Sequence, residues 1–193
     1  KVSPTMAVTT LAAQLKAQGK SIISLGAGEP DFDTPVNIKK AAKKAIDEGE
    51  TKYTPVGGTQ VLKKAIYEKF KNENSLIYDP NDQITVSNGG KHVIFNALVA
   101  TLNKDDEVII PAPYWVSYPD MVLFAGGKPI ILNTTINKGF KVSPNQIESL
   151  ITDKTKWIIL NSPSNPTGST YSKDELIAIG EVIKKYPNIW VMS

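Results

Sequence analysis

The sequence contains neither cysteine nor arginine. All 22 basic residues are lysines, and 19 acidic residues leave a formal net charge of +3. The absence of cysteine excludes disulfides and thiolate metal sites, and it agrees with a cytoplasmic location, which we expect for this protein. Arginine is the usual clamp for a substrate carboxylate, because its planar guanidinium donates two parallel hydrogen bonds. If the protein acts on dicarboxylic acids, that clamp is not an arginine of these 193 residues.

Long apolar runs are also absent. None approaches the ~18 residues of a membrane-spanning helix, so we expect no membrane contact. Lysine pairs such as Lys39-Lys40 and Lys184-Lys185 stand beside apolar residues at helical spacing. This pattern indicates solvated helix faces rather than a nucleic-acid surface. The single histidine, His92, has no evident metal or catalytic partner in the sequence, so we expect it to be structural and we expect no metal site.

Helix and strand patterns alternate along the chain. Periodicity and capping signals predict helices at 5–16, 35–48, 59–72, 91–102 and 119–124, with Thr34 as the cap of the second, and two more behind capping boxes at Ser143 and Ser172. Short extended or strand segments, apolar on both faces, are expected at 22–25, 84–87, 107–110, 129–132, 157–160 and 189–192. This order predicts a three-layer α/β fold with a mainly parallel sheet that helices cover on both sides.

In such sheets, ligands bind in the loops beyond the carboxyl ends of the strands. The first of these loops reads SNGGKH, residues 87–92, and leads into a helix. Gly89 and Gly90 at a helix start would expose backbone N–H groups to an anion, and Lys91 would add a positive charge. An ordinary glycine-rich turn is the alternative interpretation.

Two further loops follow expected strands. PAPYWVSYP, residues 111–119, brings Tyr114, Trp115 and Tyr118, which either fill core space or offer a flat face to a planar ligand. NSPSNPTG, residues 161–168, holds Asn161 and Asn165 in a loop stiffened by two prolines, which would fix both amides toward the cleft. A phosphate cradle, an aromatic plate and a fixed amide donor together suit a flat aromatic cofactor that carries a phosphate.

The residues of five motifs match a known family. GAGEPDFDTP (26–35), KYTPVGG (52–58), SNGGKH, PAPYWVSYP and NSPSNPTG together resemble class I aminotransferases of the aspartate aminotransferase type, and most closely the bacterial subgroup, some members of which also transaminate prephenate. GAGEPD lacks the third glycine and the following helix of a dinucleotide site. The resemblance implies pyridoxal phosphate as the cofactor and the large domain of the fold called type I.

The resemblance also implies roles for single residues. Gly89, Gly90 and Lys91 would hold the cofactor's phosphate. Trp115 would stack on the pyridine ring, and Asn165 would hydrogen-bond the ring's phenolic oxygen, with both residues also touching the substrate.

Two more residues are assigned by the same resemblance. Gly28 would contact the substrate carboxylate through its backbone, and Tyr53 would reach the phosphate held by the neighbouring subunit of a homodimer. Residues 1–33 would belong to the small domain of the enzyme, and residues 34–193 to the first half of its large domain.

Three parts of the family's machinery are not found in these motifs. The lysine that links to the cofactor, the aspartate that pairs with the pyridinium nitrogen and the arginine clamp all follow the strand that matches 189–192, so no catalytic residue is expected before Ser193. We therefore expect the chain to be the N-terminal half of an enzyme that moves an amino group between L-aspartate and 2-oxoglutarate, with prephenate as a further acceptor. The alternatives are another enzyme on this fold, either an aromatic aminotransferase or a carbon–sulfur lyase, and a non-enzymatic aminotransferase-like regulator domain.

Overall fold

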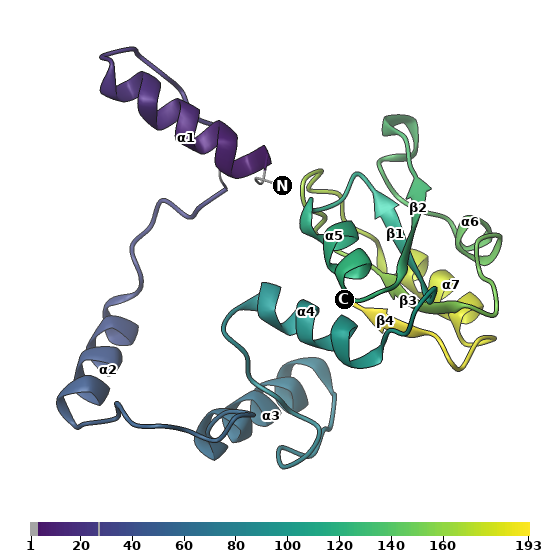
Figure 1. Ribbon diagram of the computed structural model, residues 1–193. Coiled ribbons are helices and arrows are strands. Elements are labelled where there is room, and N and C mark those ends of the chain that lie inside the picture. Colours follow the sequence, from purple (N-terminus) through teal and green to yellow (C-terminus); the bar gives the residue numbers. More distant parts are fainter. Residues whose placement is uncertain (1–3, 27) are drawn as a thin grey trace. The chain divides into compact units, whose positions relative to one another are not determined.

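The computed structural model describes residues 4–26 and 28–193. These residues form two compact units, which divide between Thr54 and Pro55. The first unit contains helices α1 (Pro4–Ala17) and α2 (Val36–Asp47) (Figure 1). Thr34 was expected to cap α2, and this is wrong. Pro35 is extended (φ −52°, ψ 141°) and occupies the cap position itself, so α2 begins one residue later without a side-chain cap. The assignment of residues 1–33 to a small domain stays a prediction.

The second unit is built around a four-stranded sheet. Along the chain its elements are α3 (Gln60–Asn74), α4 (Gly90–Thr101), β1 (Glu107–Ala112), α5 (Ser117–Phe124), β2 (Lys128–Asn133), the short helix η1 (Ile136–Lys138), α6 (Pro144–Glu148), β3 (Thr155–Ile159), α7 (Lys173–Ile183) and β4 (Trp190–Met192). The strands lie in the order β2-β1-β3-β4, and all three pairings are parallel. The predicted parallel α/β fold is thereby confirmed.

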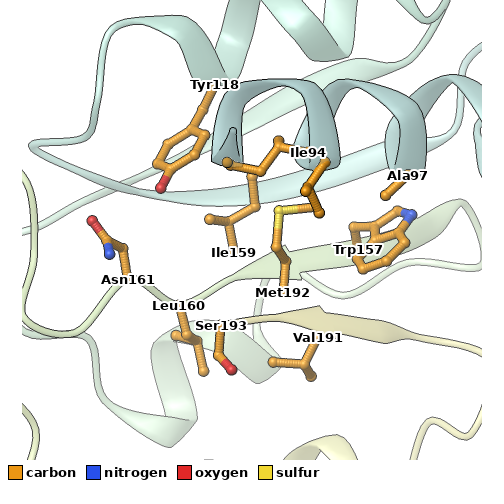
Figure 2. Close-up of a pocket in the computed structure, with 12 residues that line it drawn as sticks. Ile94, Ala97, Tyr118, Trp157, Ile159, Leu160, Asn161, Val191, Met192 and Ser193 are labelled. Atoms are coloured by element: carbon orange, nitrogen blue, oxygen red, sulfur yellow. The ribbon is translucent and has the colours of Figure 1, made fainter. Parts of the chain in front are cut away.

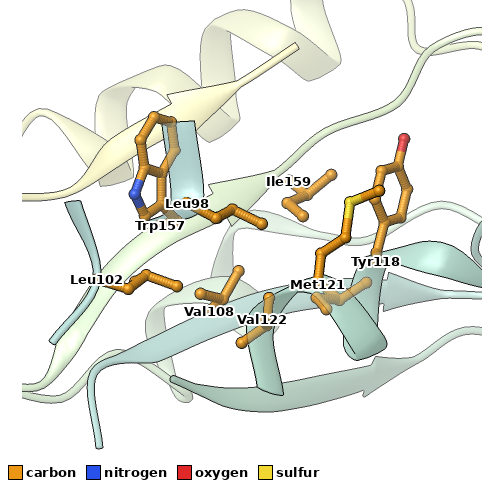
Figure 3. Packing of buried hydrophobic residues seen from close by; sticks show 9 residues of the cluster. Leu98, Leu102, Val108, Tyr118, Met121, Val122, Trp157 and Ile159 are labelled. Carbon is orange, nitrogen blue, oxygen red and sulfur yellow. The ribbon is translucent and has the colours of Figure 1, made fainter. Parts of the chain in front are cut away.

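Alternate residues of the strands pack on opposite sides of the sheet, which explains why these strands are apolar on both faces. Val108 and Ile110 of β1 join Trp157 and Ile159 of β3 in a cluster with side chains of α4 and α5 (Figure 3). Ile109 packs on the other face, in a cluster that includes side chains of α6 and α7. Two helical layers therefore cover the sheet, as the sequence predicts.

The strand expected at 84–87 is not formed. The Val86 N–H donates to the Gly57 carbonyl (3.0 Å), and Ile84 is buried, but no strand lies beside this segment within 4–26 and 28–193. A strand is defined by a ladder of hydrogen bonds to a neighbour, and a single bond to a loop does not make one. Close packing still fixes the segment, because a Cβ built at Gly58 (φ 100°) would lie 2.8 Å from the Val86 Cβ.

Helix α3 begins after Thr59, whose side chain accepts a hydrogen bond from the Leu62 N–H, as a helix cap does. The face that the sequence makes apolar is largely exposed, with Val61 at 83%, while Lys63 is the buried residue of this helix. The Lys63 ammonium donates to the Asn81 carbonyl (3.0 Å), which draws its aliphatic stem inward. In the described part of the chain, no helix is both long and apolar enough to cross a membrane.

Candidate active site

The carboxyl ends of the strands lie at one edge of the sheet, because the pairings are parallel and nearly in step. Ala112 is opposite Asn133, and Ile159 is opposite Met192. A cavity of about 570 Å³ lies at this edge, between the first turns of α4 and the ends of β3 and β4 (Figure 2). Its lining includes Gly90, Tyr118 and Asn161. The edge at which the sequence predicts ligand binding is therefore hollow.

The first turn of α4 presents free backbone donors. Gly89, with φ 87°, precedes the helix, and its carbonyl accepts from the N–H groups of His92 and Val93. The N–H groups of Gly90 and Lys91 have no acceptor among the described residues. Apart from the adjacent residues and the backbone of α4, no atom lies within 4 Å of a Cβ built at Gly89 or Gly90. The positive end of the helix dipole adds to these open donors. This arrangement fits a phosphate, as the sequence predicts for the loop.

Lys91 and Trp115, which are 24 positions apart in the sequence, meet in the structure. The Lys91 Nζ lies 5.2 Å from the centroid of the Trp115 ring, which is within the range of a cation–π contact. Trp115 is half-buried, and Tyr118 meets its ring edge-on, with 5.3 Å between centroids and an interplanar angle of 87°. The candidate phosphate-binding residue Lys91 and the candidate stacking residue Trp115 therefore belong to one site.

Tyr118 is a residue whose role the sequence left open. Its side chain is buried (8% exposed) and lines the cavity, with the hydroxyl pointing toward Asn161 in Figure 2. Burial raises the pKa of the Tyr118 phenol above its ordinary 10.0, because the phenolate would lose hydration. The phenol is therefore neutral and a hydrogen-bond donor at neutral pH. The sequence marks this loop by its tyrosines and prolines, but it does not reveal which aromatic ring is buried.

The loop after β3 is held by its own hydrogen bonds. The Asn165 N–H donates to Asn161 Oδ1 (2.9 Å), and the Gly168 N–H donates to the Ser164 carbonyl (2.7 Å). The Ser162–Pro163 and Asn165–Pro166 peptide bonds are cis. Both asparagines were expected to aim their amides into the cleft. Asn161 does line the cavity, and its Oδ1 also accepts the hydrogen bond from Asn165 inside the loop.

Asn165 remains available for a ligand. Its side-chain amide makes no hydrogen bond within the described residues, and Asn165 lines a small hollow beside the main cavity together with Tyr114, Phe140 and Tyr171. Asn161, Tyr118, Ile159 and Leu160 line both spaces. An amide donor is therefore present beside the cavity at the edge of the sheet.

His92 has a local role, as expected from the sequence. Its Nδ1 accepts a hydrogen bond from the Asn88 N–H (3.3 Å), which ties the start of α4 to the preceding loop. Among the described residues, no group of histidine, aspartate and glutamate side chains could hold a metal ion.

Gly28 and Tyr53 belong to the first unit, not to the unit that contains the cavity. Gly28 has open space where a Cβ would lie, and the Tyr53 side chain is fully exposed. Their expected roles toward a substrate carboxylate and toward a neighbouring subunit stay predictions.

Comparison with known proteins supplies the family. Residues 20–193 match the family of class I and II aminotransferases. The chain is 60% identical over all 193 residues to the aspartate/prephenate aminotransferase of Cereibacter sphaeroides, of which it covers 48%. The structure is similar to the aspartate aminotransferases of Rhizobium meliloti (TM-score 0.93, 48% identity) and of Thermus thermophilus with maleate (TM-score 0.94, 43% identity), covering 99% of this chain and 48% and 50% of theirs. The chain thus spans about half the length of these relatives, and it belongs to the class I and II aminotransferase family.

Proposed function

We propose that this chain is part of a pyridoxal-phosphate-dependent aspartate aminotransferase of the cytoplasm. The reaction moves an amino group between L-aspartate and 2-oxoglutarate, and prephenate serves as a further acceptor. The observation that carries the proposal is the meeting of the α4 start, Lys91 and Trp115 beside the cavity that the loop of Asn165 borders. The names of the similar proteins support the substrate class, and the similar Thermus thermophilus structure is of the enzyme with maleate, a dicarboxylic acid.

The residues of this chain fit the cofactor's chemical groups. The free N–H groups of Gly90 and Lys91, next to the turn at Gly89, would hold the phosphate, and the Lys91 ammonium would balance its charge. The half-buried Trp115 would stack on the ring, and the Asn165 amide would donate to the phenolic oxygen. When bound, pyridoxal phosphate supplies the electron sink for chemistry at the substrate's α-carbon.

Other parts of the proposed active site are not supplied by the residues around the cavity. Gly28 would contact the substrate carboxylate, and Tyr53 would reach the phosphate of a neighbouring subunit in a homodimer. The covalent lysine, the pyridinium aspartate and the arginine clamp would belong to the half of such an enzyme that this chain does not cover.

The test is an assay of the full-length enzyme with aspartate, glutamate, phenylalanine and tyrosine as donors and with 2-oxoglutarate, oxaloacetate and prephenate as acceptors. We expect aspartate and glutamate to give kcat/KM values at least ~10-fold above the aromatic donors, because a second carboxylate adds charge-assisted hydrogen bonds. The absence of turnover with either dicarboxylic donor would refute the proposal. A preference for aromatic donors would instead support an aromatic aminotransferase.

A further inference from the structure

A segment after β2 is bound by side chains of the residues that follow the loop of Asn165. This segment, residues 136–142, follows β2 and includes η1. The Ser169 hydroxyl donates to the Gly139 carbonyl (2.6 Å), and the Val142 N–H donates to the Tyr171 hydroxyl oxygen (2.9 Å). The Lys141 ammonium also forms an ion pair with Glu175 at the start of α7 (2.8 Å). Three side chains of residues 169–175 therefore hold the segment.

The segment has an unusual backbone where it reaches the site. Gly139 (φ 62°) and Phe140 (φ 55°) are both in the left-handed region, which disfavours a residue with a Cβ. Phe140 lines the small hollow together with Asn165 and Tyr171. A conformation that is unfavourable on its own persists only where the surroundings impose it, and the hydrogen bonds at Gly139 and Val142 flank Phe140 on both sides.

Tyr171 connects this segment to the loop of Asn165. Its backbone N–H donates to Ser162 Oγ (3.2 Å) inside that loop, while its hydroxyl accepts from Val142 in the segment. Burial raises the pKa of Tyr171 above 10.0, and the Val142 N–H opposes this in part, so the phenol is neutral at neutral pH.

We propose that Tyr171 is a positioning residue for Asn165. Through its hydroxyl it holds residues 136–142, and Phe140 with them, against the hollow that Asn165 borders, which limits the motion of the Asn165 amide. The inference rests on the proposed role of Asn165 toward the cofactor's phenolic oxygen. Nothing in the sequence marks Tyr171 for this, because its partner is 29 positions away.

The test uses the full-length enzyme with its cofactor and follows the cofactor's visible absorbance against pH. Asn165→Ala should raise the apparent pKa of the absorbance change by about one unit, because it removes a donor that stabilises the phenolate. Tyr171→Phe should raise the same pKa by about a third of that amount, because it loosens the donor without removing it. Phe is nearly isosteric with Tyr, so the variant keeps the ring packing.

Two controls separate positioning from a general loss of structure. Lys141→Met breaks the ion pair with Glu175 but keeps the two hydrogen bonds that flank Phe140, so its titration should shift less than that of Tyr171→Phe. The double variant Tyr171→Phe/Asn165→Ala should titrate like Asn165→Ala alone, because Tyr171 acts through Asn165.

The outcomes distinguish the inference from the function on which it rests. A Tyr171→Phe titration equal to that of the parent, with Asn165→Ala shifted, would overturn the positioning role and leave the role of Asn165 intact. Shifts that add in the double variant would also overturn it, since Tyr171 would then act on the cofactor independently. An unshifted Asn165→Ala would reject the proposed role of Asn165 and the inference together.

Discussion

Replacing Thr101 by valine should destabilise the wall of the cavity without changing its shape. The indole N–H of Trp157 donates to Thr101 Oγ1 (2.8 Å), and the Thr101 hydroxyl donates to the Ala97 carbonyl one turn earlier in α4 (2.6 Å). Trp157 is 5% exposed and lines the cavity together with Ala97. Valine has nearly the volume of threonine but cannot accept a hydrogen bond, so the buried indole N–H would lose its acceptor.

The expected loss follows from this geometry. A buried donor left without a partner costs about 1–3 kcal/mol, whereas the Ala97 carbonyl keeps its place in the helix and costs little. The added methyl group gains at most about 0.8 kcal/mol, because Thr101 is only half-buried. We therefore expect Thr101→Val to lower the free energy of unfolding by about 1–2 kcal/mol.

Equilibrium urea denaturation of the two proteins measures this difference as a shift in midpoint at constant slope. Thr101→Ser is the matched control, because it keeps the hydroxyl and loses only a methyl group, so its loss should be the smaller one. A Thr101→Val protein that is as stable as the parent within about 0.3 kcal/mol would refute the reasoning. A Thr101→Ser protein that loses more unfolding free energy than Thr101→Val would refute it as well.

Two further predictions concern the site. Trp115→Ala in the full-length enzyme should weaken cofactor binding by roughly 3- to 10-fold, the equivalent of an aromatic stacking contact, and should lower turnover. Trp115→Phe keeps a flat ring and should lose less affinity. The rate of cofactor loss on dialysis measures both effects, and equal retention by the parent and the two variants would contradict a stacking role. Residues 1–193 alone, mixed with pyridoxal phosphate and reduced with borohydride, should show no stoichiometric label on any single lysine and no transamination. One fully labelled lysine together with turnover would place the catalytic centre within this chain.

The interactions that the sequence determined are local. Ser143 and Ser172 were predicted to begin capping boxes, and both boxes are present, with Gln146 and Glu175 as the reciprocal partners. A capping box joins residues three positions apart, so its geometry follows from the sequence spacing. Strands β1 and β3 were equally predictable, because a strand covered on both faces is largely apolar on both sides.

Other features depended on which segments the fold brings together. The strand predicted at 84–87 was wrong, because a strand requires a neighbour that the residues of the segment cannot supply. The apolar face of α3 was visible in the sequence, but its exposure was not, because exposure depends on what packs against a helix.

The candidate site divides in the same way. Glycines before a helix, tyrosines after a strand and asparagines beside prolines marked three loops, because each residue type brings its own chemistry wherever it lies. Only the tertiary structure decided that Lys91 meets Trp115, that Asn161 Oδ1 is used inside its own loop, and that the Tyr171 hydroxyl holds Val142. Contacts between segments distant in the sequence depend on the path of the parallel sheet and its crossovers, and side-chain chemistry alone does not specify that path.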